Sequence, residues 1–509
     1  MRRVVTGGLV VNGDGESLLD GQDVLIVDGR VERIGFHVAE ASDEVVDARD
    51  CVVLPGLVNV HTHGVTGGPL MPSGGLPLPR WKWMNNLDRH LLQGTTAVLN
   101  LCGFATMEKV KEADRAHPIH VAGATTHEPN AIRAAIAADG AGMSRPDIIG
   151  TSVGEQIAQG AVAIGELGGG QTLAGGGQDL VYLPAAFLRR HGARVGAEQA
   201  RELKEAVLGR RLEWIGATNS SATLERVAVV LTRMSLDARL GPEDVVSVVC
   251  DTVLPSLGPA LKGIREGVRL AQKHGVPAFV HSAAATAGLL TKLADDRTMG
   301  SARIVASHVN HTSHSPDEAL TLARLGKAVG WTNEACVFDL ISGREMIETR
   351  EQWDVLFDSD ESLVDVVGTD YGPDGRHDGL LEVVRDLTES GRMSLPQAVA
   401  LVSSAPADLV PGLTPARGRI ALGLPADLVI VDRADLTRVR HVLIGGRVVV
   451  NGGLISAVAQ PPVLDADQFA TLESAVGTDL ALRDELDVAD SLRGLKRGLK
   501  ELGRWMESD

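Results

Sequence analysis

Short apolar runs separated by turn dipeptides occupy both ends of the chain. Residues 9–11 and 24–27 precede an Asn-Gly and an Asp-Gly pair, and residues 441–450 repeat the pattern near the other end. Such pairs between apolar runs are typical of β-hairpins. Two β-rich ends around a different middle predict one small β-sandwich domain, built from residues 1–54 and 415–462.

Strand-like and helix-like segments alternate through the middle of the chain, residues 55–414. Residues 118–123 and 160–164 are short apolar runs of the kind that form buried strands. Repeated strand–helix units indicate a parallel sheet, open or closed, and therefore an α/β fold. The apolar spacing predicts helices over residues 106–116, 258–274 and 315–325.

One stretch is too long for this alternation. More than 100 residues separate Glu166 from His281, and two glycine triplets interrupt them. Residues 197–214 within it have the pattern of a solvated amphipathic helix. We therefore predict an insertion over residues 168–256, which either caps a site or is a surface elaboration without a role.

A charged segment closes the chain. Residues 463–509 have helical spacing, with apolar positions at Leu495, Leu499 and Leu502. This pattern predicts a helical tail that packs on the body of the protein or on a neighbouring subunit.

Composition and charge narrow the class of protein. The 509 residues carry 49 basic and 66 acidic side chains, a formal charge of −17, which argues against nucleic-acid binding because no basic surface is indicated. No run of 18 apolar residues is present, so no membrane-spanning helix is expected. The start of the chain lacks the apolar core of a signal peptide, which favours a cytoplasmic protein.

The cysteines do not form a recognisable motif. They are widely separated, without a Cys-x-x-Cys pair, so a disulfide scaffold is excluded and a thiolate zinc site is not expected. Each is interpreted as a small buried apolar residue. They are Cys51, Cys102, Cys250 and Cys336.

Two histidines follow the first apolar run of the middle region. His61 and His63 come directly after residues 52–60, and strand alternation places both side chains on one face. Two imidazoles on one face at the end of a strand can chelate one metal ion. The alternative is a pair of hydrogen-bonded core histidines.

Four further polar residues occupy equivalent positions later in the chain. Each of them ends a largely apolar run, and any single one could instead be a hydrogen-bonding neighbour of a ligand. Five such strand ends in chain order, each with a metal-binding residue type, indicate one site, because barrel active sites lie where the strands end. The four residues are Glu166, His281, His308 and Asp370.

Residues 55–63, Pro-Gly-Leu-Val-Asn-Val-His-Thr-His, resemble the first-strand signature of the metal-dependent amidohydrolase superfamily. The resemblance implies a (β/α)8 TIM barrel with metal ligands on strands one, four, five, six and eight. Residues 418–420 and 424–430 resemble the segment that closes the family's flanking β domain. A strand-four glutamate with Gly-Glu-x-Gly around it, and Ser-His-Val-Asn at 307–310, resemble the enamidase branch, whose members open a cyclic enamide.

This resemblance also implies a cofactor and a mechanism. Two divalent ions are expected, Zn²⁺ being the ion that the donor set suits best, with Fe²⁺, Mn²⁺ or Co²⁺ as alternatives. A metal-bridging hydroxide would attack the carbonyl, and Asp370 would act as general base and then general acid. The implied ligands are His61, His63 and Asp370 for one ion, His281 and His308 for the other, and Glu166 for both.

The expected activity is hydrolysis of a non-peptide C–N bond in a cyclic amide, lactam, enamide or imide. One alternative is a mononuclear deaminase, against which Glu166 and the absence of an obvious His-x-x-Glu after strand five argue. Another is an N-acetyl deacetylase, which would recruit Glu128. A non-catalytic assembly protein is disfavoured because all six ligand positions are filled.

The partner is expected to be a small molecule, without nucleic acid or membrane, and the resemblance implies a homo-oligomer. Four residues near the strand ends are candidates for binding the substrate. They are Asn310, His127, His311 and Tyr371, of which His311 is interpreted in preference as a solvated loop residue.

Overall fold

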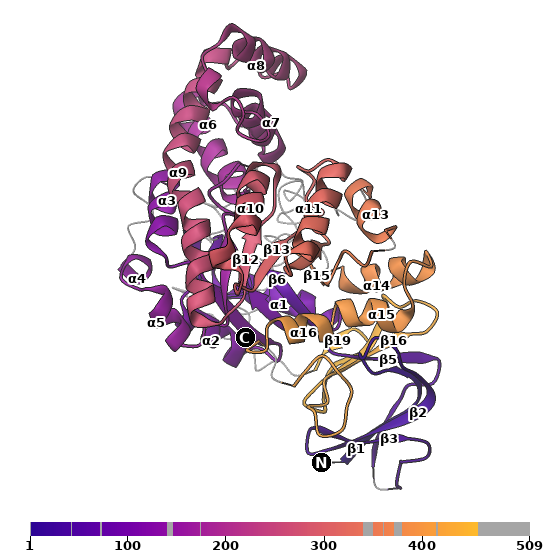
Figure 1. Ribbon diagram of the computed structural model, residues 1–509. Helices are drawn as coiled ribbons and strands as arrows, with labels where there is room; N and C mark the ends of the chain where they lie inside the picture. Colours follow the sequence, from indigo (N-terminus) through magenta and orange to yellow (C-terminus); the bar gives the residue numbers. More distant parts are fainter. Residues whose placement is uncertain are drawn as a thin grey trace, which may run out of the picture.

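The computed structural model describes residues 2–41, 43–71, 74–139, 146–173, 175–338, 350–359, 361–370, 379–413 and 416–456. Tyr371 and the tail over residues 463–509, both singled out above, lie outside the described residues. The structure of the described chain consists of a sheet formed by both ends, a barrel, and a helical unit that stands on the barrel (Figure 1).

The two ends of the chain form one mixed sheet, as their hairpin pattern predicted. Strand β5 (Cys51–Pro55) joins the two halves, because it pairs in parallel with β1 (Arg2–Val11) and antiparallel with β16 (Leu428–Asp432). Buried valines, leucines and isoleucines from both halves form a common core. The sheet is completed by β2 (Leu18–Val27), β3 (Arg30–Gly35), β4 (Glu44–Asp47), β17 (Val439–Ile444), β18 (Arg447–Asn451) and β19 (Leu454–Ile455).

Eight parallel strands form the barrel in chain order. Their side chains are almost all buried, so the strands appear in the sequence as continuous apolar runs rather than alternating ones. The ladder runs from β6 to β15, and side-chain hydrogen bonds described below link these two end strands. The strands are β6 (Leu57–Thr62), β9 (Thr95–Asn100), β10 (His120–Thr125), β11 (Ala163–Leu167), β12 (Ala278–His281), β13 (Ile304–Ser307), β14 (Thr332–Cys336) and β15 (Val366–Gly368).

Helices surround these strands, and a short hairpin of β7 (Pro69–Met71) and β8 (Gly74–Pro77) follows β6. The helix predicted to start at Ser315 is present, with the Ser315 hydroxyl accepting from the N–H of Glu318 as an N-cap. The helices are α1 (Arg80–Leu92), α2 (Met107–Ala116), α3 (Pro129–Asp139), α4 (Pro146–Ile149), α5 (Val153–Ala158), α10 (Ala284–Asp295), α11 (Pro316–Ala328), α13 (Glu351–Phe357), α14 (Leu380–Glu389), α15 (Leu395–Leu401) and α16 (Ser404–Leu409).

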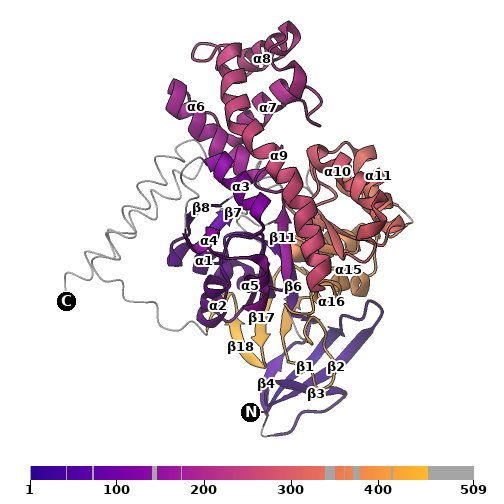
Figure 2. The same cartoon turned by 60° about the vertical axis from the view of Figure 1, so that its left-hand side comes forward.

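The segment between β11 and β12 forms a helical unit with its own apolar core. Its helices are η1 (Gln178–Tyr182), α6 (Leu183–His191), α7 (Ala197–Leu208), η2 (Ile215–Ala217), α8 (Ser221–Arg233) and the first half of α9 (Pro242–His274). Their buried side chains form a cluster separate from those of the barrel. Figure 2 shows α6, α7 and α8 gathered at the far end of α9, which continues down along the barrel.

Two of the predicted helices have different boundaries. The helix expected over 258–274 is the second half of α9, which begins at Pro242 and continues through Pro255 and Pro259. The helix expected over 197–214 ends at Leu208, because Gly209 has a positive φ of 79°. One face of that helix is buried in the core of the helical unit and Glu198 and Glu202 are exposed, as an amphipathic pattern implies.

Among the described residues, α9 alone is long and apolar enough to span a membrane by length and composition. Half of its most apolar window is buried inside the protein. Ile264 and Val268 in its second half belong to the same buried apolar cluster as Leu167 on β11, which is the environment of a core helix.

Candidate metal centre

The six sequence-predicted ligands lie together at the carboxyl end of the barrel strands. His61 lies within β6, which His63 follows, Glu166 lies within β11, and His281 ends β12. His308 directly follows β13, and Asp370 follows β15 by two residues. All six side chains are buried. Parallel strands place their carboxyl ends at one face, so ligands spaced along 310 residues converge.

Glu166 occupies the middle of this cluster. Its Oε1 lies 2.7 Å from Nδ1 of His281 and 2.9 Å from Nε2 of His308. Its other oxygen, Oε2, faces the opposite side and lies 3.8 Å from Nε2 of His63. One oxygen of the Glu166 carboxylate thus lies beside His281 and His308, and the other lies on the side of His63.

Asp370 lies beside the two first-strand histidines. Its Oδ1 is 3.3 Å from Nε2 of His63 and 3.6 Å from Nε2 of His61. Asp370 has a positive φ of 51°, a backbone conformation that non-glycine residues adopt infrequently and that is enriched at functional sites. The carboxylate therefore faces the same point as both imidazoles.

The charges in the cluster depend on one another. Burial raises the pKa of the Glu166 carboxyl, but the charges and hydrogen bonds of His281 and His308 outweigh burial and hold that pKa well below its usual range. Burial lowers the pKa of His308, yet its hydrogen bond with Glu166 raises it to about 9. Burial dominates at His281 and lowers its pKa. The Glu166 carboxylate is therefore an anion inside the protein, the state in which it can bind cations.

The donor set is able to hold divalent metal ions. In the part of the chain that the structure describes, three groups have donor atoms within 4.8 Å of one another. They are His61, His63 and Glu166; Glu166, His281 and His308; and His61, Glu334 and Cys336. Nε2 of His61 and Nε2 of His281 are buried without a hydrogen-bond partner among these residues. Buried polar atoms are rarely unsatisfied, and imidazole with carboxylate suits Zn²⁺ and other first-row ions.

Three residues that the sequence analysis did not include in the site contact the first-strand histidines. Glu334 and Cys336, both on β14, lie 3.0 Å and 3.7 Å from Nδ1 of His61. Cys102, just after β9, lies 3.4 Å from Nδ1 of His63. In the sequence, Glu334 is a glutamate within the otherwise uncharged run Thr-Asn-Glu-Ala-Cys, and this unusual position could have identified it as a candidate site residue.

The sequence analysis interpreted all four cysteines as small buried apolar residues, and the structure shows different surroundings for them. Cys102 and Cys336 are buried as expected, but both lie against candidate metal ligands rather than in an apolar core. Cys51 and Cys250 are only partly buried. The prediction that all four are buried is therefore wrong for these two.

The predicted substrate-binding residues occupy different surroundings. Asn310 donates to the carbonyl oxygen of Cys336 at 2.8 Å and accepts from its N–H at 2.9 Å, so its amide braces β14. The ring of His311 lies 5.2 Å from that of His308, and its Nδ1 accepts from the N–H of Ser313. His127 is buried against Phe104 and Thr125.

Glu128, which the deacetylase alternative would recruit, is buried after β10. Neither of its oxygens has a hydrogen-bond partner within the described ranges. Burial raises the pKa of Glu128 to about 8. The carboxyl is not a member of any group of described residues that could share an ion.

The helical unit contacts the loop that follows β13. Arg210, after α7, donates to the carbonyl oxygen of Ser313 and forms an ion pair with Glu318, with hydrogen bonds of 2.5 Å and 2.9 Å. Arg201 on α7 donates to the hydroxyl of Thr312 at 3.4 Å. The insertion therefore lies against the segment that carries His311.

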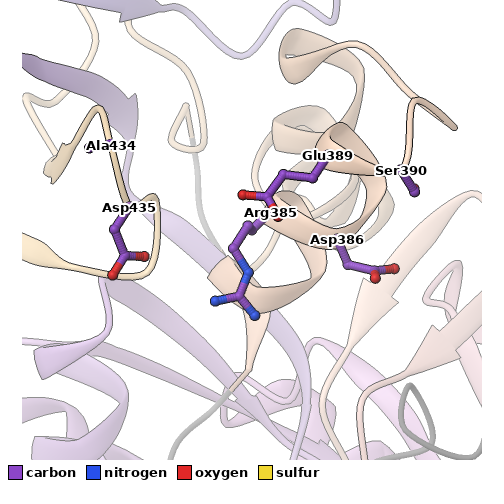
Figure 3. A pocket seen from close by; sticks show the side chains of 6 residues that line it. All are labelled: Arg385, Asp386, Glu389, Ser390, Ala434 and Asp435. Carbon is purple, nitrogen blue, oxygen red and sulfur yellow. The ribbon is translucent and has the colours of Figure 1, made fainter.

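A polar surface hollow lies elsewhere, between α14 and the turn that joins β16 to β17 (Figure 3). Arg385, Asp386, Glu389, Ser390, Ala434 and Asp435 line it. None of the six candidate ligands lines this hollow, and we do not associate it with the metal centre.

Comparison with known proteins gives short sequence matches, and no family model matches the chain. A 5-methylthioadenosine/S-adenosylhomocysteine deaminase of Pyrococcus furiosus is 32% identical over 83 residues, 16% of this chain and 19% of that protein. A dihydroorotase of Pelotomaculum thermopropionicum is 41% identical over 63 residues, 12% and 14% of the two chains. A D-phenylhydantoinase of Escherichia coli O1:K1 is 42% identical over 64 residues, 12% and 13%. The chain thus spans less than a fifth of the length of each relative.

A β-aspartyl dipeptidase of Fervidobacterium islandicum AW-1 is a structural neighbour with a TM-score of 0.49 and 14% identity, covering 91% of this chain and 99% of that one. The carboxyl-end ligand cluster stands on a parallel barrel flanked by a sheet from both termini. In sequence, the chain is similar to short segments of a deaminase, a dihydroorotase and a hydantoinase, and these matches are consistent with a metal-dependent amidohydrolase.

Proposed function

We propose that this protein is a binuclear metal hydrolase that opens a cyclic amide, a lactam, an enamide or an imide. The observation that carries the proposal is the position of Glu166, whose two oxygens face different histidines across the centre of the cluster. A mononuclear site does not need a buried carboxylate between two histidine groups. The matches to a dihydroorotase and a D-phenylhydantoinase support a cyclic amide as the substrate.

Six residues of this chain would hold the two ions, and one of them would also transfer the proton. His61, His63 and Asp370 would hold one ion, His281 and His308 the other, and Glu166 both. When bound, two divalent ions supply a water of lowered pKa and polarise the carbonyl of the amide. Asp370, with Oδ1 beside both first-strand histidines, would take the proton of the attacking water and deliver it to the leaving nitrogen.

We further propose that the helical unit forms part of the substrate pocket. Its contacts at Thr312 and Ser313 lie within two residues of His311, whose ring approaches those of His281 and His308. A cap in this position would restrict the size of the substrate and exclude water during ring opening. The substrate is a small molecule, and a homo-oligomer is the expected assembly.

The test is a substrate panel on protein purified without chelator and supplied with Zn²⁺ or Mn²⁺. Five- and six-membered cyclic imides, dihydropyrimidines, hydantoins and enamide lactams are followed by chromatographic detection of the ring-opened acid. We expect ring opening of at least one class, and its loss in Asp370→Asn. Release of ammonia from aminopurine nucleosides, with no ring opening, would contradict the proposal.

Deamination is the second candidate function, because a deaminase is among the sequence relatives. It predicts one essential ion and no dependence on Glu166. The same panel therefore includes an adenine nucleoside with ammonia detection, and the Glu166→Ala variant separates the two functions.

A further inference from the structure

Glu334 is a buried carboxylate on the seventh barrel strand. Both Glu334 and His61 are fully buried, and Oε2 of Glu334 lies 3.0 Å from Nδ1 of His61. The other oxygen, Oε1, has no hydrogen-bond partner among the described residues. Burying a carboxylate inside a protein costs free energy unless the carboxylate is paired. The hydrogen bond to His61 offsets this cost for Glu334.

The surrounding backbone is arranged around this contact. The carbonyl oxygen of Glu334 accepts from the N–H of Val309, which follows His308. Gly368 on β15 lies directly against the pair, because a Cβ there would be 2.5 Å from Oε1 of Glu334 and 2.7 Å from Cβ of His61. A side chain at position 368 would therefore displace either the carboxylate or the imidazole.

The bond determines which nitrogen of His61 carries the proton. A carboxylate can only accept, so Nδ1 of His61 must donate, and Nε2 then presents a lone pair. Nε2 is the nitrogen that lies 3.6 Å from Asp370 and has no other partner among the residues described. The second first-strand histidine differs, since Nδ1 of His63 has a thiol, Cys102, as its neighbour at 3.4 Å.

We propose that Glu334 is a positioning residue, which fixes the tautomer and orientation of His61 so that Nε2 is available to a metal ion. This inference rests on the metal centre proposed above. A hydrogen-bonded carboxylate also makes an imidazole a stronger ligand, and loss of such a partner typically weakens metal affinity by about 10–100-fold. The thiol beside His63 is a weaker acceptor, so the two histidines contribute unequally.

The test measures metal affinity of metal-stripped protein by competition with a chromophoric zinc chelator. We expect Glu334→Ala to bind the ions about 10–100-fold more weakly than wild type. Glu334→Gln retains an oxygen that accepts from Nδ1, but the bond is no longer charge-assisted, so a loss of about five-fold is expected. The absorption spectrum of Co²⁺-loaded protein should also change in both variants.

Two controls separate positioning from general disruption. Gly288→Ala adds a methyl group at an exposed position of α10 where nothing lies within 4 Å, and Glu128→Gln alters another buried carboxyl that shares no ion. Both are expected to keep wild-type affinity. Thermal unfolding of the metal-free variants reports any structural effect separately from binding.

Wild-type affinity in Glu334→Ala would overturn the role of Glu334 while leaving the metal centre intact. If the alanine variant does not fold, wild-type affinity in Glu334→Gln together with an unchanged Co²⁺ spectrum has the same meaning. Wild-type protein that takes up no metal would instead contradict the proposed function.

Discussion

The hydroxyl of Thr369 donates a hydrogen bond of 3.0 Å to the carbonyl oxygen of His61, and thereby ties the last strand of the barrel to the first. The same hydroxyl accepts at 2.8 Å from the amide of Asn59. The amide oxygen of Asn59 in turn accepts from the N–H of His61. Closure of the barrel and placement of His61 and Asp370 therefore depend on one buried network.

Replacement of this hydroxyl should destabilise the barrel. Thr369→Val keeps the shape but leaves the Asn59 amide and the His61 carbonyl without their partner, so we expect a loss of about 1–3 kcal/mol in the free energy of unfolding. Thr369→Ser retains the hydroxyl and should lose about 1 kcal/mol or less. Urea titration of both variants measures the difference. Equal stability of the two would show that the network contributes nothing.

Gly169 provides the space that the Glu166 carboxylate occupies. A Cβ at position 169 would lie 2.6 Å from Cδ of Glu166, whose carboxylate is fixed by His281 and His308. Gly169→Ala should therefore displace that carboxylate and lower metal affinity more than about 10-fold, with little change in thermal stability.

The matched control for this substitution is Gly288→Ala. Nothing lies within 4 Å of a Cβ at this exposed position of α10, and alanine favours a helix by about 0.5–1 kcal/mol. This variant should keep its metal and gain slightly in stability. Metal contents that are equal in the two variants would contradict the steric argument.

Glu128 should make stability depend on pH. Its pKa is raised from 4.5 to about 8, so between these values the folded chain holds a proton that the unfolded chain has released. Its contribution is fully present below about pH 4.5 and is lost as the pH rises through about 8, with a slope of at most about 1.4 kcal/mol per pH unit. Thermal unfolding of wild type and Glu128→Gln across this window should show the variant gaining relative stability as the pH rises. Parallel curves would contradict a buried protonated carboxyl.

The helical unit contains a fully buried ion pair between Lys204 and Asp179. Burial lowers the pKa of Lys204, and Asp179 opposes this effect. Lys204→Met leaves the buried Asp179 with Arg201, 3.7 Å away, as its remaining cation, so we expect a loss somewhat below the roughly 3–5 kcal/mol of an uncompensated buried charge. The exposed pair Arg190–Asp251 in the same unit is the control, and Arg190→Ala should cost less than about 1 kcal/mol. Urea unfolding of both variants compares the two pairs, and similar losses would contradict the argument.

The barrel, the terminal sheet and the convergence of the six polar residues follow from local sequence patterns. His61, Glu166, His281 and Asp370 were visible because each is a polar residue in or next to a short apolar strand. Parallel strands then bring such residues to one face, whatever their separation in the chain. The hairpin dipeptides near both ends similarly indicated the sheet that β5 completes.

The boundaries of α9 and the contacts of Glu334 and Asn310 depend on residues far apart in the chain, so local sequence patterns do not predict them. The apolar spacing predicted a helix over residues 258–274, but packing in both the helical unit and the barrel supports α9 from Pro242 onward. Glu334 on β14 could not be assigned to the site from the sequence, because only the fold places it beside His61 on β6. The hydrogen bonds of Asn310 with the backbone of Cys336 are a pairing that only the fold reveals, and its role at the substrate stays a prediction.

The central claim is that Glu166 joins two metal sites, and the most direct test is the number of metal ions bound per chain. Elemental analysis of wild type purified without chelator is compared with Glu166→Ala, and with Glu128→Gln as a buried-carboxyl control. We expect about two ions in wild type and in the control, and one or fewer in Glu166→Ala. One ion in all three proteins, or two ions retained in Glu166→Ala, would contradict it.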